Sequence, residues 1–366
     1  MEDWQLESIA VVGMACRLPG SIDGPSNLWD MFREKRSVQT PEVSSSCFNI
    51  DVHYHPDLAR PGSFKSLDGY FLDGNLEDFD PTFFNMTSVE AVWLDPQRQK
   101  MLKVTYECLK SAGLSLESVS GANMAVFVGS FTLHDQHCLF FFGLCNTQCP
   151  SRSSSWDCCV AIVGGVNLVL TVDQHMNTAK LGVLSPTSTC HTFDATTHGY
   201  RRTEGADALY LKKLSDAIRD GDIIRGVVRS SAANTNDNVN GMDITYPSIK
   251  GQERVVREAY TKAQLDSIET AYAECHGTVT TVGDSVDARA ISRDLNDTRD
   301  LDKPPILGAI KANIGHSGTA SGIFAAMKVG MLIENGVIPG VCGLKNLHPA
   351  ITTDERTVKT NQETLP

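Results

Sequence analysis

Short runs of β-branched and other apolar residues alternate along this chain with segments in which apolar residues recur every three or four positions. The run at 9–14 predicts a strand that ends in a Pro-Gly turn, and the spacing over 25–35 predicts a helix. A second helix is predicted from Asp95, as N-cap, and Pro96, at the first helical position, to Gly113. This alternation of strands and helices predicts an α/β fold.

The later part of the chain continues the alternation. A buried strand is predicted at 124–129, further strands at 206–211 and 223–228, and helices at 251–263 and 321–336. Asp207 is an exception within its strand, because an apolar residue is expected there. The helix at 321–336 is apolar over most of its length and is predicted to be a core helix beneath the sheet. Residues 36–75, rich in Ser, Pro, Gly and Asp, predict a surface excursion.

The composition is typical of a large cytoplasmic protein region. The chain has 366 residues, enough for one or two domains with a substantial core. Its formal net charge of -12 argues against a nucleic-acid-binding or membrane-binding surface. The longest apolar run, 158–172, is shorter than the ~20 residues that span a bilayer. The N-terminus lacks the regions of a signal peptide, so the eleven cysteines are expected to be reduced thiols.

Two segments near the C-terminus each place a histidine just after an apolar, strand-like run. Glu274-Cys275-His276-Gly277-Thr278-Val279-Thr280 follows 268–273, and Lys311-Ala312-Asn313-Ile314-Gly315-His316 follows 306–310. The carboxyl ends of strands are where α/β folds gather polar groups for chemistry. Two neutral imidazoles that meet there could donate hydrogen bonds to a carbonyl or stabilise an enolate. The alternative is two unrelated loop histidines.

The residues around both histidines resemble the two histidine motifs of the β-ketoacyl synthases, E-A-H-G-T-G-T-x-x-G-D and K-x-N-I-G-H-x-E. Further matches occur upstream in the family's order, at Ile9–Gly20, Leu94–Gln99, Val163–Asn167 and Phe193–Ala195. The resemblance covers residues 9 to about 351. It is most similar to the ketosynthase of a fungal-type polyketide synthase.

This resemblance implies a thiolase-like fold, in which two related α/β halves with mixed five-stranded sheets form an α/β/α/β/α stack. Residues 7–185 are expected to form the N-terminal half and residues 186–351 the C-terminal half. The charged and polar residues 352–366 are predicted to be a disordered tail. The fold is expected to be incomplete, because the family's closing strands and their G-F-G-G loop are absent from the sequence.

The family's reaction is a decarboxylative Claisen condensation between thioesters. A cysteine thiolate takes an acyl chain from a phosphopantetheinyl carrier, and the histidines matching His276 and His316 help to decarboxylate a malonyl thioester and stabilise its enolate. Thr278 and Thr280 match residues that bind the pantetheine arm, and Lys311 matches a lysine that pairs with a glutamate. The resemblance implies an acyl carrier partner, a homodimer, no bound metal or cofactor, no nucleic acid and no membrane.

The resemblance fails between residues 129 and 164, where the family has two strands, part of its dimer interface and the nucleophile motif D-T-A-C-S-S-S. The interval is about half as long as that layout requires, so the nucleophile segment is predicted to be missing between about 130 and 160. Cys149 is a poor substitute, because Pro150 and Arg152 do not reproduce the small residues of the motif. A zinc site is also disfavoured by the C-x6-C-x3-C-x8-C-C spacing of His134, His137, Cys138, Cys145, Cys149, Cys158 and Cys159.

Two further departures fall inside the histidine motifs. Val279 replaces a glycine and is expected to be tolerable only if its φ angle stays negative. Gly318 replaces the glutamate, so Lys311 is expected to lack its fixed partner. The sequence leaves open an impaired or inactive condensing enzyme, a non-catalytic remnant that acts as an interaction module, and an intact enzyme from which one exon was missed.

Overall fold

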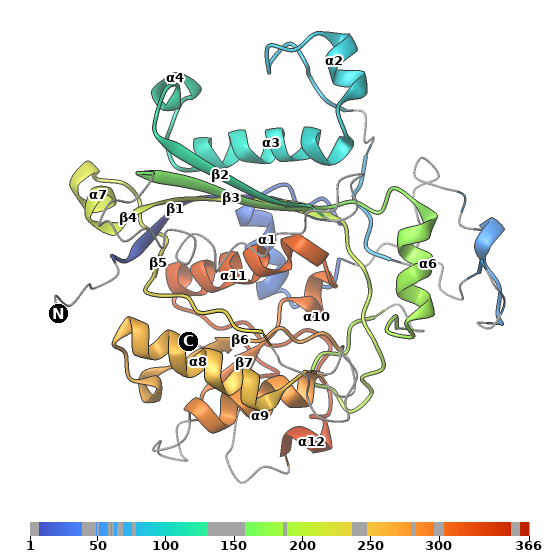
Figure 1. Ribbon diagram of the computed structural model, residues 1–366. Helices are drawn as coiled ribbons and strands as arrows, with labels where there is room; N and C mark the ends of the chain where they lie inside the picture. Colours follow the sequence, from blue (N-terminus) through green and yellow to red (C-terminus); the bar gives the residue numbers. More distant parts are fainter. Residues whose placement is uncertain are drawn as a thin grey trace.

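We describe a computed structural model of the chain (Figure 1). The description covers residues 7–38, 49, 51–57, 60, 62–63, 69–74, 78–130, 158–185, 189–235, 247–279, 283–295, 304–352 and 359–365.

A five-stranded mixed sheet forms the centre of the larger layer. Its strands are β1 (Ile9–Arg17), β2 (Met124–Ser130), β3 (Val160–Asn167), β4 (Gly205–Lys213) and β5 (Gly226–Val228). Their order is β2-β3-β4-β1-β5, with β2 and β3 parallel and the other pairs antiparallel. Since β4 and β5 belong to this sheet, the sheet extends beyond residue 185, where the resemblance sets the end of the first half.

The alternation of side chains along β1 explains why helices cover both faces of this sheet. Ala10 and Val12 face α3 (Pro96–Ser111), where Val104 and Cys108 are buried. Residues of the opposite face pack against α1 (Pro25–Arg33) and α11 (Ser321–Asn335). α11 is the core helix that its apolar sequence predicts, and it lies between this sheet and the second sheet (Figure 1).

The second sheet is small and parallel. Its strands are β6 (Tyr272–Glu274), β7 (Ile306–Gly308) and β8 (Lys359–Thr360), and α8 (Ile249–Ala263) and α9 (Gly283–Leu295) lie on its outer side (Figure 1). A third apolar cluster, including Phe193, Ala288 and Leu307, fills this part of the molecule. The five-layer α/β/α/β/α stack is therefore confirmed, with three strands among the described residues of the second sheet where the resemblance predicts five.

Shorter elements complete the described chain. They are the helices α2 (Ser88–Trp93), α4 (Leu116–Val119), α6 (Val172–Lys180), α7 (Leu214–Asp220), α10 (Lys311–Ile314) and α12 (Pro349–Thr352), and the 3-10 turns η1 (Asp51–His53), η2 (Ser267–Glu269) and η3 (Gly318–Ala320).

Both ends of α3 lie where the sequence predicts them. The Asp95 side chain accepts a hydrogen bond from the Gln97 amide, Pro96 begins α3, and Gly113 follows its end with a φ angle of 76°. Asp207 does lie inside β4, where its Oδ1 accepts from the Gly165 amide at 2.8 Å. Its complete burial raises the pKa of the carboxyl group well above its usual value.

Three predictions about elements were wrong. The tail 352–366 was predicted to be disordered, but β8 pairs with β7 and Leu365 pairs with Ile338, because main-chain hydrogen bonding does not require an apolar sequence. The strand β2 was predicted to be buried, but Val126 is 60% exposed because β2 lies at the edge of the sheet in the described part of the chain. The run 268–273 is a strand only from Tyr272 onward, because Ile268 and Glu269 belong to the 3-10 turn η2.

Candidate active site

His276 and His316 lie at the same edge of the second sheet. Strands β6 and β7 are parallel neighbours with Glu274 opposite Gly308, so the segments that follow them leave the sheet close together. The two imidazole ring centroids are 5.6 Å apart, and the ring planes are at 90° to each other. The structure therefore brings together the two histidines that the sequence places in separate motifs.

Lys311 is buried in α10 and is bonded to the first histidine loop. Its Nζ donates to the main-chain carbonyl of His276 at 2.6 Å and lies 3.3 Å from His276 Nδ1. Burial lowers the pKa of the Lys311 ammonium group, while Glu274 and other acidic groups raise it. The expectation that Lys311 lacks a fixed partner is wrong, because the His276 carbonyl oxygen fills that role.

The main chain of His316 is held like a residue of a strand. Its amide donates to the Arg201 carbonyl at 2.7 Å, and its carbonyl accepts from the Thr203 amide at 3.0 Å. The ring lies beside that of Tyr200, with centroids 4.9 Å apart. Its position is therefore set by a segment more than a hundred residues earlier in the chain.

The hydrogen bonds at the two Nδ1 atoms fix the tautomers of both rings. The Gly318 amide, which can only donate, points at His316 Nδ1 at 3.0 Å, so this nitrogen accepts and the proton is on Nε2. The Lys311 ammonium group faces His276 Nδ1 in the same way, which places that proton on Nε2 as well. Each neutral ring therefore presents an Nε2–H donor.

Both rings are uncharged at neutral pH. Burial first, and the Lys311 ammonium group second, lower the pKa of His276 to about 3. More than a third of His276 is exposed, so solvent screens part of this effect, but the direction remains downward. Burial lowers the pKa of His316 well below its usual value, and Lys311, His276 and Arg202 add to the decrease.

Two aspartates of α9 hold the loop that follows His276. The Gly277 amide donates to Asp287 Oδ2 at 3.0 Å, and the Val279 amide donates to Asp284 Oδ1 at 2.8 Å. The second oxygen of Asp284 accepts from the Phe193 amide at 2.9 Å. Sequence reasoning included Asp284 in the motif but missed Asp287. Its position three residues after Asp284, on the same face of α9, is the signal that could have found it.

Val279 adopts the left-handed conformation, with a φ angle of 60°, so the expectation of a negative φ angle is wrong. The side chain is fully buried, and the carbonyl oxygen accepts from the Gly199 amide and from Thr197 Oγ1, both at 2.8 Å. A β-branched residue costs about 1–3 kcal/mol in this conformation. The hydrogen bonds at the amide and carbonyl groups of Val279 hold its main chain in this left-handed conformation.

A buried ion pair connects the first histidine motif to α11. Lys328 Nζ lies 2.8 Å from Glu274 Oε2, and the two side chains are only 6% and 5% exposed. Glu274 Oε1 accepts from the Ile310 amide at 2.5 Å, and the Tyr272 hydroxyl also donates to this carboxylate. Sequence reasoning missed Lys328, because a lysine in an apolar helix gives no indication of which carboxylate it faces.

Of the remaining predicted site residues, the structure describes some and not others. Thr278 is half-buried in the loop between Gly277 and Val279. Thr280 lies outside the described residues, as do Cys149 and most members of the disfavoured zinc site. Among the residues that the structure describes, no group of three or more His, Cys, Asp or Glu side chains could hold a metal ion. No helix in this part of the chain is long and apolar enough to cross a membrane.

Two family models match the chain. The model "Beta-ketoacyl synthase, N-terminal domain" matches residues 6–140 and 154–217, and "Beta-ketoacyl synthase, C-terminal domain" matches residues 225–345. Residues 141–153, inside the interval where the nucleophile segment is expected, match neither model.

The chain is also similar to curated polyketide synthases and to solved ketosynthase structures. The chain is 49% identical to a reducing polyketide synthase (DEP5) of Fusarium langsethiae and 41% identical to a highly reducing polyketide synthase (resH) of Aspergillus sclerotiorum. These alignments cover 95% and 98% of the chain but only 16% of each relative. The ketosynthase from module 6 of the Bacillus subtilis bacillaene synthase is 27% identical, with a TM-score of 0.88, over 98% of this chain and 67% of that one.

The alignment with the Fusarium relative also supports a deletion. It is 389 positions long although the chain has 366 residues, so at least 23 positions have no counterpart in this chain. The length of the alignment does not locate these positions, so the missing segment between about 130 and 160 stays a prediction.

Proposed function

Because the chain belongs to the β-ketoacyl synthase family, we propose that it is the ketosynthase-type condensing region of a fungal-type polyketide synthase, with its histidine pair retained and its condensation step impaired. One observation supports the retained part above all others. His276 and His316 are neutral, their Nδ1 atoms are occupied, and their rings lie 5.6 Å apart, so two Nε2–H donors are available to one carbonyl oxygen.

The proposed chemistry of these donors is the cleavage of a malonyl thioester. The bond between the carboxylate and the α-carbon breaks, carbon dioxide leaves, and the electron pair moves into the thioester to form an enolate oxygen. His276 and His316 donate hydrogen bonds to that oxygen as its negative charge develops. Losing one such donor costs roughly 10²–10³ in rate. Lys311 acts as a positioning residue through the His276 carbonyl, and Thr278 and Thr280 are proposed to bind the pantetheine arm.

Condensation requires a second partner, an acyl chain on a cysteine thiolate. Buried thiols in the described part of the chain are poor candidates, since burial raises the pKa of Cys190 to about 12 and that of Cys275 well above its usual value. We therefore expect no stoichiometric acylation from an acyl-N-acetylcysteamine thioester. Carbon dioxide release should also stay close to the uncatalysed rate, because Val279 and Gly318 replace family residues in the two histidine motifs and the segment that would complete the site is predicted to be missing. The second candidate function, a non-catalytic interaction module, is favoured by the same missing segment.

The decisive experiment restores that segment. Residues 131–157 are replaced by the corresponding segment of the Fusarium relative, and acylation is followed by intact mass and decarboxylation by carbon dioxide release. We expect the restored chain to be acylated at its new cysteine and to decarboxylate a malonyl carrier thioester. His276→Ala or His316→Ala in the restored chain should abolish carbon dioxide release.

Three outcomes would contradict parts of this proposal. A restored, folded chain that is inert would favour the interaction module. Turnover that is indifferent to both histidine substitutions would show that the active site is elsewhere. Acylation of the original chain at any cysteine between Cys138 and Cys159 would refute the impaired condensation step.

The proposal extends to partners and location. We propose that the chain works with an acyl carrier domain in the cytoplasm, as a homodimer, and binds neither nucleic acid nor membrane. The formal net charge of -12 supports the last point, and the cysteines in the described part of the chain are free thiols.

A further inference from the structure

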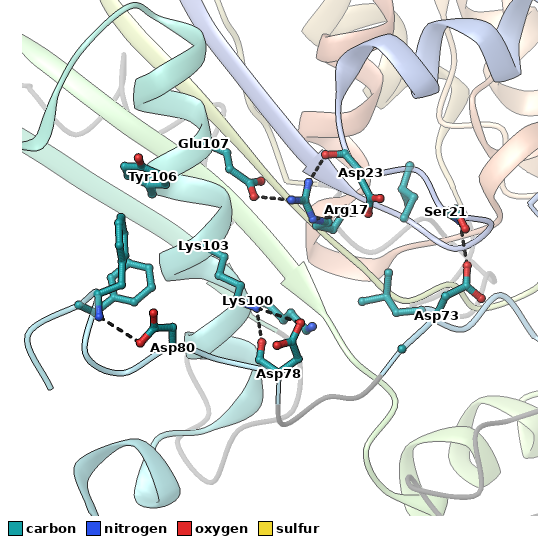
Figure 2. Close-up of a pocket in the computed structure, with 15 residues that line it drawn as sticks. Arg17, Ser21, Asp23, Asp73, Asp78, Asp80, Lys100, Lys103, Tyr106 and Glu107 are labelled. Atoms are coloured by element: carbon teal, nitrogen blue, oxygen red, sulfur yellow. Dashed lines mark hydrogen bonds and ion pairs between the residues drawn. The ribbon is translucent and has the colours of Figure 1, made fainter. Parts of the chain in front are cut away.

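A cavity of about 530 Å³ has a lining that includes neither histidine. Figure 2 shows the residues that line it. Its walls come from α3, from the turn that follows β1, and from residues 72–74 and 78–84. A volume of this size is within the range of small-molecule sites. The lining includes both charged and aromatic side chains, so the nature of a ligand depends on which of these groups are already bonded.

The acidic side chains of this cavity are bonded to donors of the protein. Arg17 bonds to Glu107, and its Nε lies 3.7 Å from Asp23 Oδ1. The Ser21 amide donates to Asp73 at 2.8 Å. Two further carboxylates complete the set: Asp80 accepts from the Thr82 and Phe83 amides, and Asp78 lies 3.7 Å from Lys103. Each carboxylate therefore has at least one donor without a ligand.

Lys100 lines the same cavity but differs from these carboxylates in its bonding. Within the described residues its ammonium group has neither a hydrogen bond nor an ion pair, although the side chain is half-buried. Burial first, and the nearby Lys103 second, lower the pKa of Lys100. Lys103 donates a hydrogen bond to the main-chain carbonyl of Asp78, whereas the Asp78 carboxylate, 3.7 Å away and 86% exposed, neutralises its charge only weakly. Two lysines one helical turn apart thus line the cavity, and an anion would stabilise both.

An aromatic wall forms another side of the cavity. The Phe83 ring meets the Tyr106 ring at 4.8 Å and 71°, and the Phe84 ring at 5.0 Å and 81°. Phe83 is 47% exposed, so part of this ring is available for contact with a ligand. Edge-to-face aromatic clusters of this kind favour a further flat apolar group.

We propose that this cavity binds a small organic anion with a planar apolar body. Its carboxylate or phosphate pairs with Lys100 and Lys103, and its body packs against Phe83 and Tyr106. The site is distinct from the one that contains His276 and His316, and its occupation does not depend on the proposed condensation chemistry.

The test is calorimetric titration of the purified chain with 2-naphthoate, and in parallel with its neutral isostere 2-naphthamide. We expect 2-naphthoate to bind and 2-naphthamide to bind at least about 10-fold more weakly, because the neutral amide lacks the charge that pairs with the two lysines. Lys100→Gln should weaken 2-naphthoate binding by about 10-fold or more. Lys110→Gln, on the same helix but outside the cavity lining, is the matched control and should change it less than twofold.

Further variants separate this site from others. Phe83→Ala should weaken binding, whereas Trp93→Ala, which removes a ring that is 86% exposed outside the cavity, should not. His276→Ala should leave the affinity unchanged. A titration with 2-naphthyl phosphate distinguishes a phosphate ligand from a carboxylate. Equal binding of 2-naphthoate and 2-naphthamide, an unaffected Lys100→Gln variant with a wild-type melting temperature, or no binding at millimolar 2-naphthoate would overturn the proposal.

Discussion

Replacing Lys328 by methionine tests whether the buried ion pair controls the stability of the histidine site. Methionine keeps most of the volume and the apolar stem of lysine but leaves the Glu274 carboxylate without its counter-ion. That carboxylate would keep the hydrogen bonds from Ile310 and Tyr272. The predicted loss therefore reports on the charge rather than on a cavity.

The expected magnitude follows from burial. Surface ion pairs contribute about 0–1 kcal/mol, whereas removing one partner of a buried pair costs about 3–5 kcal/mol. With side-chain exposures of 6% and 5% and a distance of 2.8 Å, the Glu274–Lys328 pair belongs to the second class. We expect Lys328→Met to lower the free energy of unfolding by about 3 kcal/mol or more, a large share of the 5–15 kcal/mol typical of a folded domain.

Urea denaturation, followed by circular dichroism, measures this loss. Lys262→Met is the matched control, since Lys262 pairs with Glu258 at 2.7 Å but both side chains are at least one third exposed. Its effect should stay below about 1 kcal/mol. The double variant Glu274→Gln/Lys328→Met should recover part of the stability, because no unpaired charge remains. Equal, small effects of Lys328→Met and Lys262→Met would refute the reasoning.

Three further predictions concern the backbone, the pH dependence and the sheet edge. Gly318→Ala should lower the free energy of unfolding by about 1–2 kcal/mol, because Gly318 has a φ angle of 55° and an added Cβ would lie 3.3 Å from Asn167 Oδ1. Gly322→Ala, with no atom within 4 Å of the added Cβ, should be neutral in the same urea titration, and equal effects would contradict the argument. The pKa of His316 is lowered in the folded state, so its contribution to stability is complete above pH 6.5 and declines as the pH falls, by at most about 1.4 kcal/mol per pH unit. Asp284 has a pKa raised to about 6, so between pH 3.8 and 6 it adds stability as the pH falls and opposes the effect of His316. If the pH profile of urea midpoints were unchanged in His316→Gln, the lowered pKa of His316 would be contradicted. Finally, the exposed edge strand β2 should make the chain self-associate. Val126→Lys should reduce this self-association, as measured by light scattering. A monodisperse wild-type chain with a sharp melt would show that the edge is protected.

Elements with strong local signals could be predicted from the sequence. The Asp95-Pro96 start of α3 depends on a cap and a ring that act within one turn, and the apolar sequence of α11 already requires burial. The convergence of His276 and His316 was also predictable, because both follow strands of one α/β unit. The strand β8 was not predictable, since its pairing is made by main-chain atoms of a polar segment.

The residues that hold the histidine loops in place were harder to predict than the histidines themselves. Asp287 and Lys328 act on main-chain and charged groups far away in the sequence, and only the packing of α9 and α11 brings them there. The φ angle of Val279 depends on bonds to Asp284, Gly199 and Thr197, which override the preference of a β-branched residue. Long-range hydrogen bonds of this kind leave no periodic pattern in the sequence.

The two α9 aspartates have a consequence for motion. Loops that bind ligands usually belong to the least stable parts of a protein and lose conformational entropy when the ligand arrives. Here Asp284 and Asp287 immobilise Gly277, Val279 and Phe193 without any ligand. The ordering entropy of this loop is lost during folding rather than during binding, so its amides should exchange with deuterium as slowly as those of the sheet, and substrate should meet a rigid surface.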